Sequence, residues 1–421
     1  LVNLLMTAAA VVAVFLCLGD RVAERRGAAW VGLALATYPL FLINGVRVAN
    51  DALAVCLATF TVWLGLALSS RPVESPGRRA AAFLTLGLLG GFAVLAKATN
   101  YALAPFLAFC VVALAFRPEV SLRRAAACAV ALGVGFLAVT QAEMRFNLAH
   151  YGSISSMQEA AVNHARGLGR ADLLRTAMND IPWAGWIVEL WTMLVFFAGG
   201  WSFQGTSLKA IFAHRDLVFL GAAGWAWAAL AWFAARRRGL PTTRVFSEYR
   251  LPLACLVLVA SYTGALGYHM VQSKLAWGQW STGAWYASAA MPWFLTLVVL
   301  GLLRWPLPGR LRALAPLALA GASIMAESVG VFGRMIPFYT GHVPAAEGLK
   351  RLAALQPSWL GTPTMAVALL VEVLALAALI LTLWDDARAE RVEREERSRL
   401  DATPAPHSAH RRQREDSRVA A

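Results

Sequence analysis

The chain has 421 residues, of which 59% are hydrophobic and only 15% are charged. Several apolar runs exceed the roughly 18 residues that span a bilayer, which excludes a soluble protein and predicts an all-α, polytopic bundle of membrane-spanning helices. The net charge of +14 comes almost entirely from Arg in short loops between the apolar runs, so it indicates membrane orientation rather than a nucleic-acid partner.

The hydropathy pattern predicts about eleven spans. They lie near residues 1–18, 28–45, 51–68, 80–96, 101–116, 125–146, 217–235, 251–270, 288–303, 311–330 and 364–384. If the first span runs inward, the cytoplasmic segments hold 26 of the 38 basic residues: 19–27, 69–79, 117–124, 236–250, 304–312 and the tail from 385. The positive-inside rule therefore predicts a multi-pass protein of the inner (plasma) membrane with a cytoplasmic C-terminus. We expect residues 1–384 to form the membrane domain and 385–421 to form a charged, largely disordered tail.

The same orientation places the first residue outside the membrane. Leu1 already lies within an apolar span, so we expect that at least one earlier span precedes it. A cleaved signal peptide is the alternative explanation for an exported N-terminus.

The second span ends in an outer turn that carries Arg47, Asn50 and Asp51, and the third span begins at once. An ionisable pair four residues apart at the membrane surface can face a substrate at little cost. The same residues are also typical of a topological anchor or a helix N-cap.

Two more cations lie on the outer side. Lys97 is in the turn of a short helical hairpin between the fourth and fifth spans, and Arg145 ends the sixth span. A phosphate would be a natural partner for either cation, whereas snorkelling to the membrane surface is the simpler explanation.

The outer loops are rich in polar and aromatic residues. The longest, 147–216, contains Glu159 and an apolar stretch, 187–200, that we expect to be interfacial or re-entrant, with Trp183, Trp186, Trp191 and Trp201 at headgroup depth. Loop 271–287 places Tyr286 and several Trp among Gln, Ser and Thr, a composition that suits a sugar and equally suits a plain interfacial loop. Loop 331–362 could cover the site as a lid or merely cover the bundle.

The five cysteines all fall within spans or at their ends, so we interpret them as packing residues with no disulfide or metal site. The sequence contains no nucleotide-binding glycine motif of the Gly-x-Gly-x-x-Gly or Gly-Lys-Ser/Thr type. We therefore expect no soluble nucleotide donor and no cofactor, while a need for a divalent metal stays open.

Three features together resemble the GT-C superfamily of integral-membrane glycosyltransferases: a Tyr38-Pro39 pair near the outer end of a span, an outer Asn50-Asp51 pair that opens the next span, and the run from Gly90 to Lys97. The similarity is closest to the bacterial relatives of the protein O-mannosyltransferases and of the lipid A aminoarabinose transferase. It covers most of residues 1–300. The sequence departs from the family at Ala96, where Thr is usual, and at Trp285, where Arg is usual beside Tyr286.

The resemblance implies a transferase that takes a sugar from a polyprenyl-phosphate donor at the outer face and passes it to an acceptor lipid, polysaccharide or protein. It implies Asp51 as the catalytic-site carboxylate, in an auxiliary or substrate-orienting role, beside Arg47 and Asn50. Lys97 and Arg145 would contact phosphate, and Tyr286 and Glu159 would contact sugar or acceptor. The family's catalytic acid lies in the first outer loop, so on the truncation hypothesis we expect the isolated 421-residue chain to be inactive.

Two other functional classes fit eleven spans. One is a transporter or lipid flippase of the cell envelope, although the spans show no duplicated halves of the kind found in many transporters. The other is a non-catalytic scaffold for envelope assembly.

Overall fold

The computed structural model describes residues 2–19, 25–38, 41, 50–70, 75–187, 250–279, 284–304, 309–330, 332–333, 336–355 and single positions between 367 and 381. Every regular element in these ranges is a helix, which confirms the predicted all-α class for this part of the chain. The chain divides into two compact units, Leu1–Gly348 and Leu349–Ala421. All the elements that form the site described below belong to the first unit.

The described helices are, in chain order, α1 (Val2–Gly19), α2 (Arg25–Thr37), α4 (Asp51–Ser70), α5 (Pro76–Ala96), η1 (Ala98–Leu103), α6 (Ala104–Ala115), α7 (Leu122–Tyr151), α8 (Gln158–Ala165), α9 (Arg170–Arg175), η2 (Thr176–Asp180), α13 (Arg250–Trp277), η3 (Ala284–Ala290), α14 (Met291–Arg304), α15 (Gly309–Gly330), α16 (Ile336–Tyr339) and α17 (Ala345–Ala354).

Seven segments in the described ranges are long and apolar enough to cross a bilayer: Val2–Gly19, Asp51–Ser70, Pro76–Ala96, Ala98–Ala115, Leu122–Tyr151, Arg250–Trp277 and Tyr286–Leu303. They match seven of the predicted spans and indicate a membrane protein. The spans expected at 28–45 and 311–330 contain shorter apolar helices, Gly27–Thr37 and Leu314–Met325. The span expected at 217–235, most of 364–384 and the tail 385–421 lie outside the described residues.

The exposed sides of the long helices are apolar. On α7, Val130, Val134 and Leu137 follow one another at helical spacing, and each is more than half exposed. A helix face of this kind would contact water unfavourably, but it costs nothing against lipid chains. Its composition therefore fits a helix that faces the bilayer.

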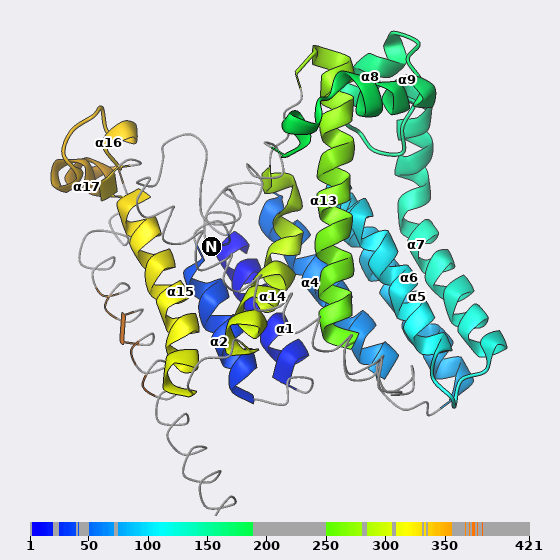
Figure 1. Ribbon diagram of the computed structural model, residues 1–421, viewed down its shortest axis with the longest axis horizontal. Coiled ribbons are helices and arrows are strands. Elements are labelled where there is room, and N and C mark those ends of the chain that lie inside the picture. Colours follow the sequence, from blue (N-terminus) through cyan, green and yellow to red (C-terminus); the bar gives the residue numbers. More distant parts are fainter. Residues whose placement is uncertain are drawn as a thin grey trace, which may run out of the picture. The chain divides into compact units, whose positions relative to one another are not determined.

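Helix packing is tightest between α5 and α7. A Cβ atom at Gly87 would lie 2.1 Å from the carbonyl oxygen of Leu132, and one at Gly135 would lie 2.3 Å from that of Leu84. Small residues allow two membrane helices to bring their backbones into contact. Elsewhere α4 packs against α1 and α5, while α13 packs against α6, η1, α8 and α14 (Figure 1).

Two helices run further than hydropathy predicts. α7 continues past 146 to Tyr151 and ends where Gly152 adopts a left-handed φ of 62°. α13 continues past 270 to Trp277, because Met270 and Val271 are buried against Ile181 and keep this part of the helix packed. Hydropathy ends a span where polar residues begin, but polar residues that pack on another element stay helical. Helix α8 packs against both α7 and α13, and α9 also contacts α13 (Figure 1).

Candidate functional site

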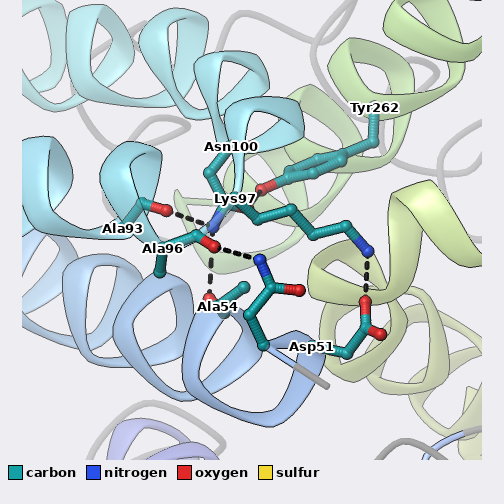
Figure 2. A network of polar contacts seen from close by, with 8 residues as sticks. Asp51, Ala54, Ala93, Ala96, Lys97, Asn100 and Tyr262 are labelled. Carbon is teal, nitrogen blue, oxygen red and sulfur yellow. Dashed lines mark hydrogen bonds and ion pairs between the residues drawn. The ribbon is translucent and has the colours of Figure 1, made fainter. Parts of the chain in front are cut away.

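Two oppositely charged helix ends meet where α4 begins and α5 finishes. Asp51 is the first residue of α4, and Lys97 is the residue at which α5 ends. Nζ of Lys97 is ion-paired with Oδ1 of Asp51, and the two side chains are only 15% and 6% exposed (Figure 2). The helix dipole favours a carboxylate at an N-terminus and an ammonium at a C-terminus. The N-terminus of α4 therefore stabilises the carboxylate of Asp51, and the C-terminus of α5 stabilises the ammonium of Lys97.

Two asparagine side chains donate hydrogen bonds to backbone carbonyls in the last turn of α5 and in α4. Nδ2 of Asn50 donates to the carbonyl of Ala96 at 2.6 Å. Nδ2 of Asn100 donates to the carbonyls of Ala93 at 2.8 Å and Ala54 at 3.2 Å (Figure 2). The carbonyl of Ala93 also accepts from the backbone N–H of Lys97 at 3.2 Å. In an apolar bundle water is scarce, so side-chain donors are well suited to carbonyls at a helix end. The end of α5 is thereby fastened to α4.

Helix α13 joins the same network. The hydroxyl of Tyr262 donates to Oδ1 of Asn100 at 2.6 Å, and both residues are 1% exposed (Figure 2). One residue earlier, the hydroxyl of Ser261 donates to the carbonyl of Ala102 at 2.5 Å. Since Asn100 uses both its amide and its carbonyl, buried hydrogen bonds link α4, α5, η1 and α13.

A second group of side chains continues from Lys97. Its Nζ lies over the ring of Tyr286 in η3, 5.5 Å from the ring centroid. The Tyr286 ring also packs against the imidazole of His269 in α13, with centroids 5.0 Å apart. Nε2 of His269 lies 3.7 Å from Oε1 of Glu159 in α8. A series of contacts therefore runs from Asp51 through Lys97, Tyr286 and His269 to Glu159.

Polar contacts between α8 and α13 place Glu159 in this series. Nδ2 of Asn163 donates to Oε1 of Gln272 at 2.6 Å, and a guanidinium nitrogen of Arg166 donates to the carbonyl of Ala276 at 2.8 Å. Asn163 is one helical turn after Glu159, and Gln272 is three residues after His269. The buried amide pair therefore fixes the register in which the carboxylate meets the imidazole.

The structure brings five of the residues predicted from the sequence into these contacts: Asn50, Asp51, Lys97, Glu159 and Tyr286. Arg145 does not join them. Its side chain is exposed on α7, and the series of contacts above does not include it. Arg47 lies outside the described residues.

Sequence reasoning missed three residues of the site: Asn100, Tyr262 and His269. A signal was present for Tyr262 and His269, because polar side chains inside apolar spans are expensive and are commonly retained for a purpose. Asn100 lies in the short turn between the predicted spans 80–96 and 101–116, where the sequence gives no such signal. His269 was hidden by its place at the end of a predicted span, where a polar residue is ordinary. Its neighbour Glu159 is far from it in the sequence, and its neighbour Tyr286 is separated from it by a loop.

The cysteines and tryptophans were also singled out from the sequence. All five cysteines are buried, as expected of packing residues, and all are free thiols. Among the described residues, no group of three or more His, Cys, Asp or Glu side chains could hold a metal ion. Trp183 is exposed, as an interfacial ring would be, whereas Trp186 packs partly on Met270 and Val271.

The arrangement combines an ammonium, an aromatic face, two carboxylates and an imidazole near one end of apolar helices. It can bind an anionic group carried by a lipid and an uncharged polyol beside it. It can also have a purely structural role, holding the ends of α4 and α5 together.

No family model, no curated protein and no solved structure matches this chain.

Proposed function

We propose that the protein is a membrane glycosyltransferase that moves a sugar from a polyprenyl-phosphate donor to an acceptor at the outer face of the cytoplasmic membrane. One observation carries the proposal. Asp51, Lys97 and Tyr286 are far apart in the sequence, yet they meet at one end of the candidate spans. A polyprenyl chain is apolar, so its phosphate belongs at such an end, where the hydrocarbon finishes.

Lys97 is the phosphate contact in this proposal. The ammonium held by Asp51 is already partly desolvated, and it turns toward the donor phosphate when the donor binds. Negative charge grows on the phosphate as the bond to the sugar breaks, so an ammonium at this place stabilises the transition state more than the ground state. Tyr286 offers its ring face to the C–H groups of the sugar. Asp51, released by Lys97, accepts hydrogen bonds from sugar hydroxyls.

The proposed reaction forms one bond and breaks one. The acceptor hydroxyl oxygen bonds to the anomeric carbon, and the bond from that carbon to the phosphate oxygen breaks, with its electron pair leaving on the polyprenyl phosphate. A base takes the hydroxyl proton. The lipid-linked donor supplies the activated sugar, and the acceptor is a lipid, a polysaccharide or a protein.

The proposed location is the inner membrane with the C-terminus in the cytoplasm. It rests on the Arg-rich short loops, since Lys and Arg near span ends favour the cytoplasmic side. On this orientation the first residue of α4 and the last residues of α5 lie outside, on the side where a lipid-linked sugar is exposed to extracytoplasmic acceptors.

Transfer from radiolabelled polyprenyl-phosphate hexoses and pentoses, measured in membranes that contain the chain, tests the proposal. Lys97→Ala should lower kcat about 10²–10³-fold, the usual effect of removing one group that stabilises developing charge. Asp51→Asn should also impair transfer. Lys274→Ala is the matched control, because Lys274 bonds the carbonyl of Gly278 and lies outside the series of contacts.

Three outcomes would contradict the proposal. Full transfer by Lys97→Ala and Asp51→Asn would place the site elsewhere. Movement of the labelled lipid across the bilayer without covalent transfer would indicate a transporter or flippase. An envelope defect caused by deletion of the protein but not by Asp51→Asn would indicate a scaffold.

A further inference from the structure

The imidazole of His269 has two different surroundings. Nε2 lies 3.7 Å from Oε1 of Glu159, whereas Nδ1 is buried and has no hydrogen-bond partner among the described residues. Buried ring nitrogens are normally bonded, so Nδ1 is available to a ligand group. A carboxylate beside Nε2 favours the tautomer with its proton on that nitrogen and leaves the lone pair on Nδ1. His269 is thereby prepared to accept a proton at Nδ1.

The distance from His269 to Lys97 suits a monosaccharide phosphate. Both side chains contact the ring of Tyr286, at 5.0 Å between centroids for His269 and 5.5 Å to Nζ for Lys97. The imidazole and the ammonium are therefore no further apart than these two distances laid end to end. A phosphate at Lys97 and a sugar against Tyr286 would bring the anomeric carbon toward the imidazole.

We propose that His269 is the general base that deprotonates the acceptor hydroxyl, and that Glu159 is a positioning residue that holds its Nε2–H. The inference rests on the proposed glycosyl transfer and assigns the base of that reaction. The carboxylate predicted from the sequence, Asp51, accepts through Oδ1 from Lys97, the proposed phosphate contact. It is therefore assigned to the hydroxyls of the donor sugar rather than to the acceptor.

The proton and electron pairs balance in this assignment. The acceptor O–H proton moves to Nδ1 of His269 as the oxygen bonds to the anomeric carbon. The electron pair of the breaking bond leaves on the polyprenyl phosphate beside Lys97. Glu159 stabilises the imidazolium that forms, as a carboxylate does for the histidine of a hydrolase. The proton then passes to solvent or to the departing phosphate.

A base at His269 predicts transfer by the 421-residue chain, in contrast to the inactivity expected from the family resemblance. Kinetics of that chain with the radiolabelled polyprenyl-phosphate hexoses and pentoses test the assignment. His269→Gln should lower kcat about 10²–10⁴-fold with little change in the KM of the donor, the usual effect of losing a general base. His269→Ala should regain part of its activity when imidazole is added. His150→Gln is the matched control, since His150 is exposed on α7 and should transfer normally.

The pH profile separates the role of Glu159 from a merely structural one. In the described part of the chain, His269 contacts the ionisable groups of Glu159 on α8 and Tyr286 on η3, and Lys97 lies over the Tyr286 ring. Wild-type transfer should fall as acid protonates His269. Glu159→Gln should move this acid limb and reduce kcat by less than His269→Gln does, whereas a structural defect would leave the limb in place.

A spectroscopic measurement tests the same geometry without turnover. In the chain labelled with ¹⁵N-histidine, the signal that His269→Gln removes should show an unprotonated Nδ1. Glu159→Gln should convert it to a mixture of tautomers. A protonated Nδ1 in the wild-type chain would overturn the inference.

The outcomes distinguish the two proposals. Wild-type kcat in His269→Gln, in preparations where Lys97→Ala is impaired, would overturn the role of His269 and leave the transferase standing. Absence of transfer by the wild-type chain with every donor would overturn the transferase and the base together.

Discussion

The substitution Gly87→Ala adds one methyl group to α5 at its closest contact with α7, and so tests that contact. In Gly87→Ala the new Cβ would lie 2.1 Å from the carbonyl oxygen of Leu132 and 2.9 Å from the backbone nitrogen of Phe136. Both neighbours are backbone atoms of α7, so no side-chain rotation relieves the overlap. Ordinary contacts begin at 3.4 Å, so the separation must grow by about 1.3 Å, the difference between 2.1 and 3.4 Å.

The two contributions to the free energy of unfolding have opposite signs. Alanine favours a helix over glycine by about 1 kcal/mol. Overpacking costs about 1–3 kcal/mol, and a backbone neighbour places this site at the upper end of that range. The net expectation is a loss of about 2 kcal/mol. In Gly133→Ala, on α7, no described atom lies within 4 Å of the new Cβ, so only the favourable contribution remains.

Reversible unfolding of the two variants in mixed micelles measures the difference. Gly87→Ala should be less stable than the wild type, and Gly133→Ala should be as stable or up to about 1 kcal/mol more stable. Equal stability of the two variants would refute the close approach of α5 and α7. A drop in both would mean that the unfolding responds to something other than this contact.

Two further predictions concern the polar network. In a double-mutant cycle, Asn100→Ala and Tyr262→Phe should show a coupling of about 0.6–1.7 kcal/mol in unfolding, because they remove the same buried hydrogen bond; additive losses would contradict it. Asp51→Asn or Lys97→Met alone should cost up to about 3 kcal/mol, since each removes one member of a poorly exposed ion pair. The double variant should recover part of that loss, and a double variant worse than the sum of the singles would count against the pair.

The span pattern could be predicted because it depends on local composition. Each long apolar run must leave water, and the Arg-rich loops respond to orientation, so neither requires knowledge of which helices touch. Helix ends were predicted less well. α7 and α13 extend past the apolar runs because both helices pack on α8. α7 then ends at Tyr151, just before Gly152 adopts a left-handed φ.

The proximity of Asp51 and Lys97 could have been predicted from the sequence. Consecutive spans joined by a short turn are antiparallel, so the start of α4 and the end of α5 had to lie at the same side of the membrane. The charge of each residue matches the dipole of its own helix end. What the pattern did not contain was the partner on α13, because Asn100 and Tyr262 are 162 residues apart and each looks like an isolated polar residue.

The sequence by itself determined the membrane environment, the helical class, the candidate spans and the candidate residues Asp51 and Lys97, because hydropathy and charge act on each segment separately. Only the tertiary structure decided that α8 lies on α13 and that η3 contacts α4 and α13. Those contacts depend on the shapes of several helices at once, so no single segment encodes them. They are what brings Glu159, His269 and Tyr286 to the ion pair and gives the site its second half.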